Sequence, residues 1–146
     1  MMKVLIVEPG KSPRTAYISP ELSSLQATVG GYIQAIYPWD DPVAVVCDEE
    51  ALLKQSEFNR LIAPEVAIFG TFFICGLGDE DFTDLPDAMI AKYAQLLHDP
   101  EVLIRTAKGC IAVRVTAIAN DIGGESNEHN IRRGSPKDHY HAILAW

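Results

Sequence analysis

The chain has 146 residues, 48% of them apolar and 22% charged, and its formal net charge is −8. This length and mixture indicate one globular domain, alone or with an appendage, that buries its own core. The negative charge argues against a general nucleic-acid binder, because affinity for a duplex comes largely from Lys and Arg on phosphates, whereas it permits a basic protein partner.

Two strands and a helix are predicted at the start of the chain. Lys3–Val7 is rich in Val, Ile and Leu, and Arg14–Ile18 is a second strand antiparallel to it across a loop that contains Pro and Gly. A helix then covers residues 20–29. Ser19 suits its N-cap, and Gly30, or the glycine after it, suits the left-handed position at its C-terminal end.

A hairpin follows, with strands Tyr32–Tyr37 and Val43–Cys47 joined by a turn between two prolines. Asp40 and Asp41 in that turn can accept hydrogen bonds from nearby amides, so the turn has a structural explanation without a ligand. Residues 48–58 predict either a short helical turn or a loop.

The most apolar run of the chain, Ala67–Cys75, predicts a central strand in which Gly70 marks a bulge or a close backbone approach. Residues 59–62 are expected to lead the chain back toward the sheet. An acidic loop, Gly76–Thr83, is followed by a second helix over Leu85–His98.

Beyond residue 100, the alternation over Cys110–Ile118 predicts a strand, and His139–Trp146 is a candidate last strand. Residues 120–137 are rich in Gly, Asn, Ser and charge, which is typical of a long loop or of disorder. We therefore predict an α+β fold, an antiparallel sheet of four to six strands with two helices packed on one face.

The three cysteines, Cys47, Cys75 and Cys110, lie in apolar runs without paired spacing. No secretory signal and no run long enough to span a membrane is visible in the sequence. These features predict reduced thiols in a cytoplasmic protein that does not engage a membrane.

Metal ligation is the less favoured interpretation of two clusters. Asp79, Asp81 and Thr83 alternate as in a calcium loop, but the central Gly and the closing Glu are absent. Four residues near the C-terminus of the chain could form a zinc site, in which the two rings of a His-x-His pair lie on one face of a strand: His129, Asp138, His139 and His141. No local Cys joins them, so we expect no metal and no cofactor.

No catalytic motif is recognisable. The chain has no Gly-x-Ser-x-Gly elbow, no phosphate-binding Gly-x-x-x-x-Gly-Lys and no Gly-x-Gly-x-x-Gly after a strand. A Cys47 or Cys75 nucleophile would need an adjacent base, and the first hundred residues offer only His98. Arg60 could bind a carboxylate or phosphate, but an ion pair with a local acid such as Glu57 is favoured because acids outnumber bases.

Four segments resemble the domain-of-unknown-function family 3846: VEPGKSP at 7–13, LQATVGGYIQAIYPWDDPVAVVCDEE at 25–50, FNRLI at 58–62 and GTFFICGLGDEDFTDL at 70–85. The resemblance covers about residues 3–103. It implies a small cytoplasmic protein of phages, plasmids or conjugative elements, sometimes encoded near antirestriction genes, with no established activity.

The chain departs from that family where the family usually shows Asn in place of Asp48 and Gly in place of Ala51, and it is shortened between Ile62 and Ile68. With the acidic excess of the first hundred residues, the resemblance predicts an acidic α+β domain over 1–103. Residues 104–146 are then a C-terminal extension of strand, loop and strand that is partly flexible.

Two functions from different classes follow. The favoured one is a non-enzymatic mobile-element accessory protein, with a counter-defence role as one option. It would bind a protein partner that is basic or itself binds DNA, without touching nucleic acid, through acidic loops. The residues of this surface are Asp40, Asp41, Asp48, Glu49, Glu50, Asp79, Glu80 and Asp81.

The alternative is a small-molecule-binding or hydrolytic protein with an apolar pocket and converging polar groups. Its residues would be Asn59, Arg60, Tyr32, Tyr37 and Trp39. A sheet edge could also pair two copies of the chain, so a homodimer is left open.

Overall fold

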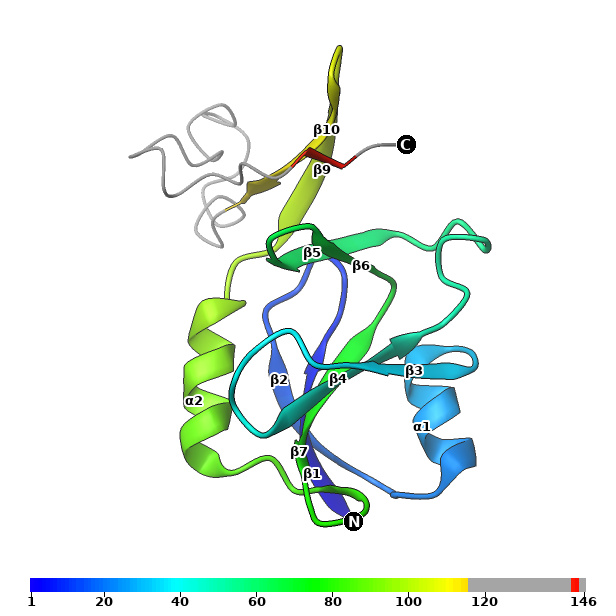
Figure 1. The fold of residues 1–146 in the computed structure, drawn as a ribbon, viewed down its shortest axis with the longest axis vertical. Helices are drawn as coiled ribbons and strands as arrows, with labels where there is room; N and C mark the ends of the chain where they lie inside the picture. The colour runs from blue at the N-terminus through cyan, green and yellow to red at the C-terminus, as the bar shows by residue number, and fades with distance from the viewer. Residues whose placement is uncertain (116–142, 145–146) are drawn as a thin grey trace.

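The computed structural model describes residues 1–115 and 143–144, and its main element is an antiparallel sheet of six strands (Figure 1). The strands are β1 Met2–Val7, β2 Arg14–Ile18, β3 Ile33–Ile36, β4 Val43–Asp48, β7 Phe72–Leu77 and β8 Phe82–Thr83. Their order is β2-β1-β7-β4-β3, with β8 paired to β7. The predicted fold class, α+β with an antiparallel sheet of four to six strands, is confirmed.

The two helices, α1 Leu22–Val29 and α2 Asp87–Leu96, cover opposite faces of this sheet (Figure 1). Val45 of β4 belongs to the same buried cluster as Tyr93 of α2, whereas the next residue, Val46, belongs to the cluster of Leu25 of α1. The expectation that both helices pack on one face is thus corrected. The physical reason is that β4 is buried along its whole length, so both of its faces need a cover.

A separate two-stranded hairpin, β5 Phe58–Ala63 and β6 Val66–Phe69, packs on the α2 side of the sheet. The predicted single strand over Ala67–Cys75 is therefore wrong in its continuity. The chain turns at Gly70, whose φ of 79° is left-handed, so that β6 ends before the turn and β7 begins after it. Residues 48–58 were expected to form a helical turn or a loop; residues 49–55 form a turn, while Asp48 ends β4 and Phe58 begins β5.

A third small sheet contains β9 Glu101–Thr106, β10 Gly109–Arg114 and β11 Ile143–Leu144. The strand β9 runs across the expected boundary at residue 103, and the Glu101 carboxylate accepts a hydrogen bond of 2.8 Å from the Leu61 amide of β5. Residues 120–137 and the four candidate zinc ligands, His129, Asp138, His139 and His141, lie outside the described residues.

The ends of the helices follow the local sequence. Gly30 has a φ of 88° and caps the C-terminus of α1, as expected for glycine at that position. The expected N-cap of α1 is corrected, because Glu21 holds that position and Ser19 lies two residues before it, where its hydroxyl accepts a hydrogen bond from the Glu21 amide. Asp87 lies in the first turn of α2. In the part of the chain that the structure describes, neither helix has the length and apolar character needed to cross a bilayer.

Candidate functional site

The predicted acidic surface residues lie at two ends of the central strands. Strand β4 begins at Val43, two residues after Asp41, and ends at Asp48, and it is antiparallel to β7, with Val43 opposite Gly76. The turn before β4 and the loop after β7 are therefore neighbours, and the Leu77 amide donates to the Pro42 carbonyl at 3.0 Å. Five residue steps along β4 separate the two ends by roughly 17 Å.

We call the first of these surfaces the acidic end; it consists of Asp40, Asp41, Asp79, Glu80 and Asp81. A hollow of about 420 Å³ lies beside the loop, lined by Tyr37, Leu77, Gly78, Asp79, Glu80, Asp81 and Phe82. The Tyr37 side chain is 59% exposed. Among the described residues, the carboxylates of Asp40, Asp79, Glu80 and Asp81 form no ion pair and no side-chain hydrogen bond, so they are available to a partner.

Asp41 is the exception, because it ties the turn before β4 to α2. Its Oδ2 accepts hydrogen bonds of 2.6 Å from the Lys92 ammonium and of 2.6 Å from the Tyr93 hydroxyl. The bonds from Lys92 and Tyr93 hold the pKa of Asp41 below its usual value. Burial and the Asp41 carboxylate raise the pKa of Tyr93, whose ring stacks on Trp39 at 4.3 Å between centroids.

At the other end of β4, Asp48 has a structural role. Its side chain is 3% exposed and pairs with the Lys54 ammonium at 2.5 Å, and its Oδ1 accepts a bond of 2.9 Å from the Glu50 amide. Lys54 also donates to the Gly30 carbonyl at 2.9 Å, which links this end of β4 to the C-terminus of α1. The structure therefore separates Asp48, with Glu49 and Glu50, from the acidic end.

The structure does not bring the residues of the alternative ligand site together. Asn59 and Arg60 are both 0% exposed. The Asn59 amide donates to the Val7 and Gly70 carbonyls at 2.9 and 2.8 Å. Arg60 donates to the carbonyl oxygens of Leu97 and Lys11 at 2.8 and 2.6 Å, so both side chains hold backbone segments together.

The three aromatic residues of that alternative site lie apart from one another. Tyr37 lines the hollow at the acidic end, while Trp39 lines a neighbouring hollow with Lys92 and packs on α2. Tyr32 is exposed at the far end of β4, where its carbonyl accepts a bond of 2.8 Å from the Glu49 amide.

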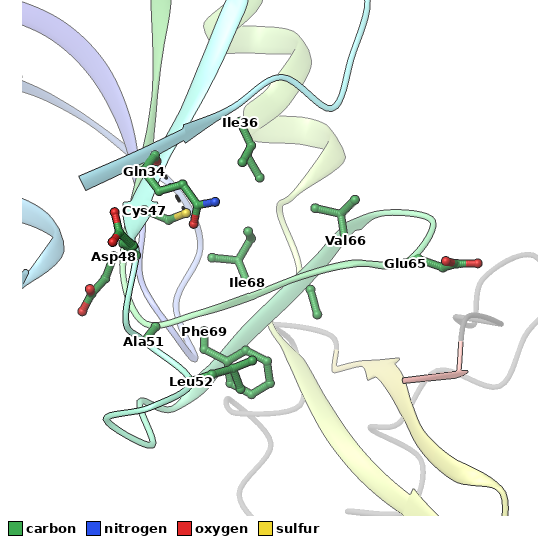
Figure 2. A pocket seen from close by; sticks show the side chains of 12 residues that line it. Gln34, Ile36, Cys47, Asp48, Ala51, Leu52, Glu65, Val66, Ile68 and Phe69 are labelled. Atoms are coloured by element: carbon green, nitrogen blue, oxygen red, sulfur yellow. Dashed lines mark hydrogen bonds between the residues drawn. The ribbon is translucent and has the colours of Figure 1, made fainter. Parts of the chain in front are cut away.

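The structure shows one feature that sequence reasoning missed, which we call the hairpin groove (Figure 2). It has a volume of about 280 Å³ and separates β3 and β4 from the β5–β6 hairpin. The lining residues are Gln34, Ile36, Cys47, Asp48, Glu49, Ala51, Leu52, Glu65, Val66, Ala67, Ile68 and Phe69. Three distant segments contribute, so no local sequence pattern could have indicated it.

The buried thiols are poorly suited to nucleophilic chemistry. Burial and the Asp48 charge raise the pKa of Cys47 to about 11, and burial raises the pKa of Cys75 to about 12. The thiolate is the nucleophilic form, and at neutral pH a raised pKa keeps both side chains in the protonated form. His98, the base considered for them, contacts Asp99 at 2.8 Å near the end of α2.

A comparison with protein-family models matches residues 2–98 to the family described as "Domain of unknown function (DUF3846)". The match covers more than half of the chain and includes the main sheet, both helices and the β5–β6 hairpin. No curated protein and no solved structure matches the chain.

Proposed function

The chain belongs to the DUF3846 family, and we propose that it acts without catalysis, as an accessory protein that binds a basic partner protein through its acidic end. The observation that carries this proposal is the hollow beside the loop 78–81, between β7 and β8. Three carboxylates without intramolecular ion pairs among the described residues surround it, and an exposed Tyr37 ring forms part of its wall.

A Lys or Arg side chain of the partner would find two kinds of interaction there. The carboxylates of Asp79, Glu80 and Asp81 offer charge-assisted hydrogen bonds, and the face of the Tyr37 ring attracts a cation. The same charges raise the rate of encounter with a basic surface, and salt screens this attraction. The resemblance to proteins of mobile elements favours a DNA-binding enzyme, such as a nuclease or a methylase, as partner, since its DNA-binding surface is basic.

The test compares two variants that lose the same charge, one at the acidic end and one away from it. D79N/E80Q/D81N removes three charges from the acidic end, and E21Q/E50Q/E57Q removes three from exposed or half-exposed positions elsewhere. The probe is a fluorescent oligo-arginine peptide, and its binding to the full chain is followed by anisotropy at low and high salt. We expect about a tenfold weaker affinity for the first variant and a much smaller change for the second.

Two results would count against this function. Equal loss of affinity in the two variants would mean that the peptide responds only to net charge. Affinity that is independent of salt and of both sets of carboxylates would mean that the acidic end takes no part in binding.

A further inference from the structure

We propose that the hairpin groove is a docking site for an extended, basic segment of a partner protein, which pairs as an added strand with the outer edge of β6. Figure 2 shows the groove with Ile36 on one side and Val66 and Ile68 on the other. The site is separate from the acidic end, and the inference does not rest on the function proposed above.

The lining residues show how the two walls are oriented. The β5–β6 hairpin contributes five consecutive residues, 65–69, whereas β3 contributes only Gln34 and Ile36. Side chains alternate between the two faces of a strand. A groove that runs along a face is therefore lined by every second residue, whereas a groove that runs along an edge is lined by consecutive residues. The groove therefore runs between the face of β3 and the edge of β6.

This edge of β6 is the open side of the hairpin. In the described residues β6 pairs only with β5, and the register of that pair contains two irregularities. On the far side of β5, by contrast, the Leu61 amide already donates to the Glu101 carboxylate. Two-stranded sheets are marginal on their own, and extended peptides commonly bind by adding a strand to such an edge.

The chemistry of the groove specifies the occupant. Three acidic residues and no Lys or Arg are among its lining side chains. The Asp48 charge is balanced by Lys54, while Glu49 and Glu65 are exposed and form no ion pair with any described residue. Asp48 and Glu65 lie at opposite ends of the groove in Figure 2.

Between these ends the lining is largely apolar, with Ile36, Cys47, Ala51 and Ile68. A strand that pairs with β6 presents every second side chain to this surface. The occupant is therefore a segment of alternating apolar residues, with Lys or Arg at both flanks to meet Glu49 and Glu65. Main-chain hydrogen bonds to β6 would supply affinity. The apolar lining and the flanking carboxylates of Glu49 and Glu65 would supply specificity.

The test uses short random peptides, displayed on phage and selected on the folded full chain. We expect enriched peptides in which apolar residues alternate and Lys or Arg flanks them. Synthetic copies should bind E49K/E65K at least about tenfold more weakly than the parent chain and bind D79N/E80Q/D81N unchanged. N-methylation of every second backbone amide of the peptide removes hydrogen-bond donors. It should abolish binding when it falls on the amides that face β6 and leave binding unchanged when it falls on the other set.

Three outcomes would overturn the proposal: no enriched peptide, enriched peptides that bind E49K/E65K as well as the parent, or equal binding of both N-methylated registers. Sedimentation of the chain alone tests a second copy as occupant, and a dimer that E65K dissociates would assign the groove to self-association instead. Glu49 and Glu65 are exposed, so E49K/E65K should keep the fold, and its urea midpoint checks this. Hydrogen exchange at Val66–Ile68 gives a second readout of peptide binding.

Discussion

The Lys54 ammonium lies 2.5 Å from Oδ2 of Asp48, so a carboxylate that is almost completely buried has a cation as its direct partner. Burial is the largest influence on this group and raises its pKa, but the bonds from Lys54 and the Glu50 amide together outweigh it. The net pKa of Asp48 therefore lies below the usual 3.8. Its contribution to stability is present above that value and is lost as pH falls through the folded pKa.

Lys54→Met should reverse this pH dependence. Without the ammonium, burial dominates and raises the Asp48 pKa above 3.8, so the contribution of the carboxyl group is lost as pH rises rather than as it falls. The difference in free energy of unfolding between the parent chain and the variant, measured by urea unfolding, should increase from about pH 3 to about pH 6.

Lys92→Met is the matched control for this experiment. It removes the strongest influence on Asp41, but the Tyr93 hydroxyl still donates to that carboxylate. No reversal of the pH dependence is therefore expected. A gap for Lys54→Met that stays constant with pH would show that Asp48 does not depend on Lys54 for its charge.

The local patterns of the sequence were sufficient to predict the hairpin of β3 and β4, the glycine cap of α1 and most of the main sheet. They could not assign faces to the helices, because an apolar run such as Val43–Cys47 looks the same whether one or both faces are covered. The same ambiguity hid the break at Gly70, where two strands of different sheets meet in one apolar run.

The functional residues were harder to predict because their roles depend on contacts between distant segments. Asp48 and Glu49 are adjacent and both acidic, yet only Asp48 is buried beside a Lys six residues later. Arg60 was considered as a ligand for a carboxylate or phosphate or as an ion-pair partner, and in the structure it donates to the carbonyls of Leu97 and Lys11, about forty to fifty positions away in the sequence. Such long-range placement leaves no trace in composition or periodicity.

Substitution of two glycines should destabilise the chain for different physical reasons. A Cβ at Gly76 would overlap the backbone carbonyl oxygen of Asp84, whereas at Gly30 it would meet nothing within 4 Å, but φ there is +88°. Gly76→Ala should therefore cost about 1–3 kcal/mol through overpacking, and Gly30→Ala about 1 kcal/mol through backbone strain.

Asparagine distinguishes these two causes, because it tolerates the left-handed conformation but is larger than alanine. Gly30→Asn should be less destabilising than Gly30→Ala, and Gly76→Asn should be more destabilising than Gly76→Ala. Urea midpoints of the four variants measure this order, and the same order at both positions would contradict the assignment.

The thiols should be protected in the folded chain. The pKa of Cys47 is raised to about 11 and that of Cys75 to about 12, and Cys110 is also buried. At neutral pH a colourimetric disulfide reagent should modify native protein slowly and all three thiols of urea-unfolded protein rapidly. Rapid, stoichiometric modification of Cys47 in the native chain would instead indicate an activated thiol and reopen a catalytic interpretation.

Arg60→Met tests whether the guanidinium is structural or binds a ligand. The variant keeps the apolar stem but leaves the carbonyls of Leu97 and Lys11, and the Asn59 side-chain oxygen, without their donor. Unsatisfied buried groups cost about 1–3 kcal/mol each, so the free energy of unfolding should fall by roughly 3–5 kcal/mol, a large part of a typical domain's stability. Arg14→Met, on an exposed arginine that pairs with Glu8 at 3.2 Å, should cost less than about 1 kcal/mol. If Arg60→Met unfolds at the same urea concentration as the parent chain, Arg60 does not hold β5 to the end of α2, and a ligand-binding role for it would be the better explanation.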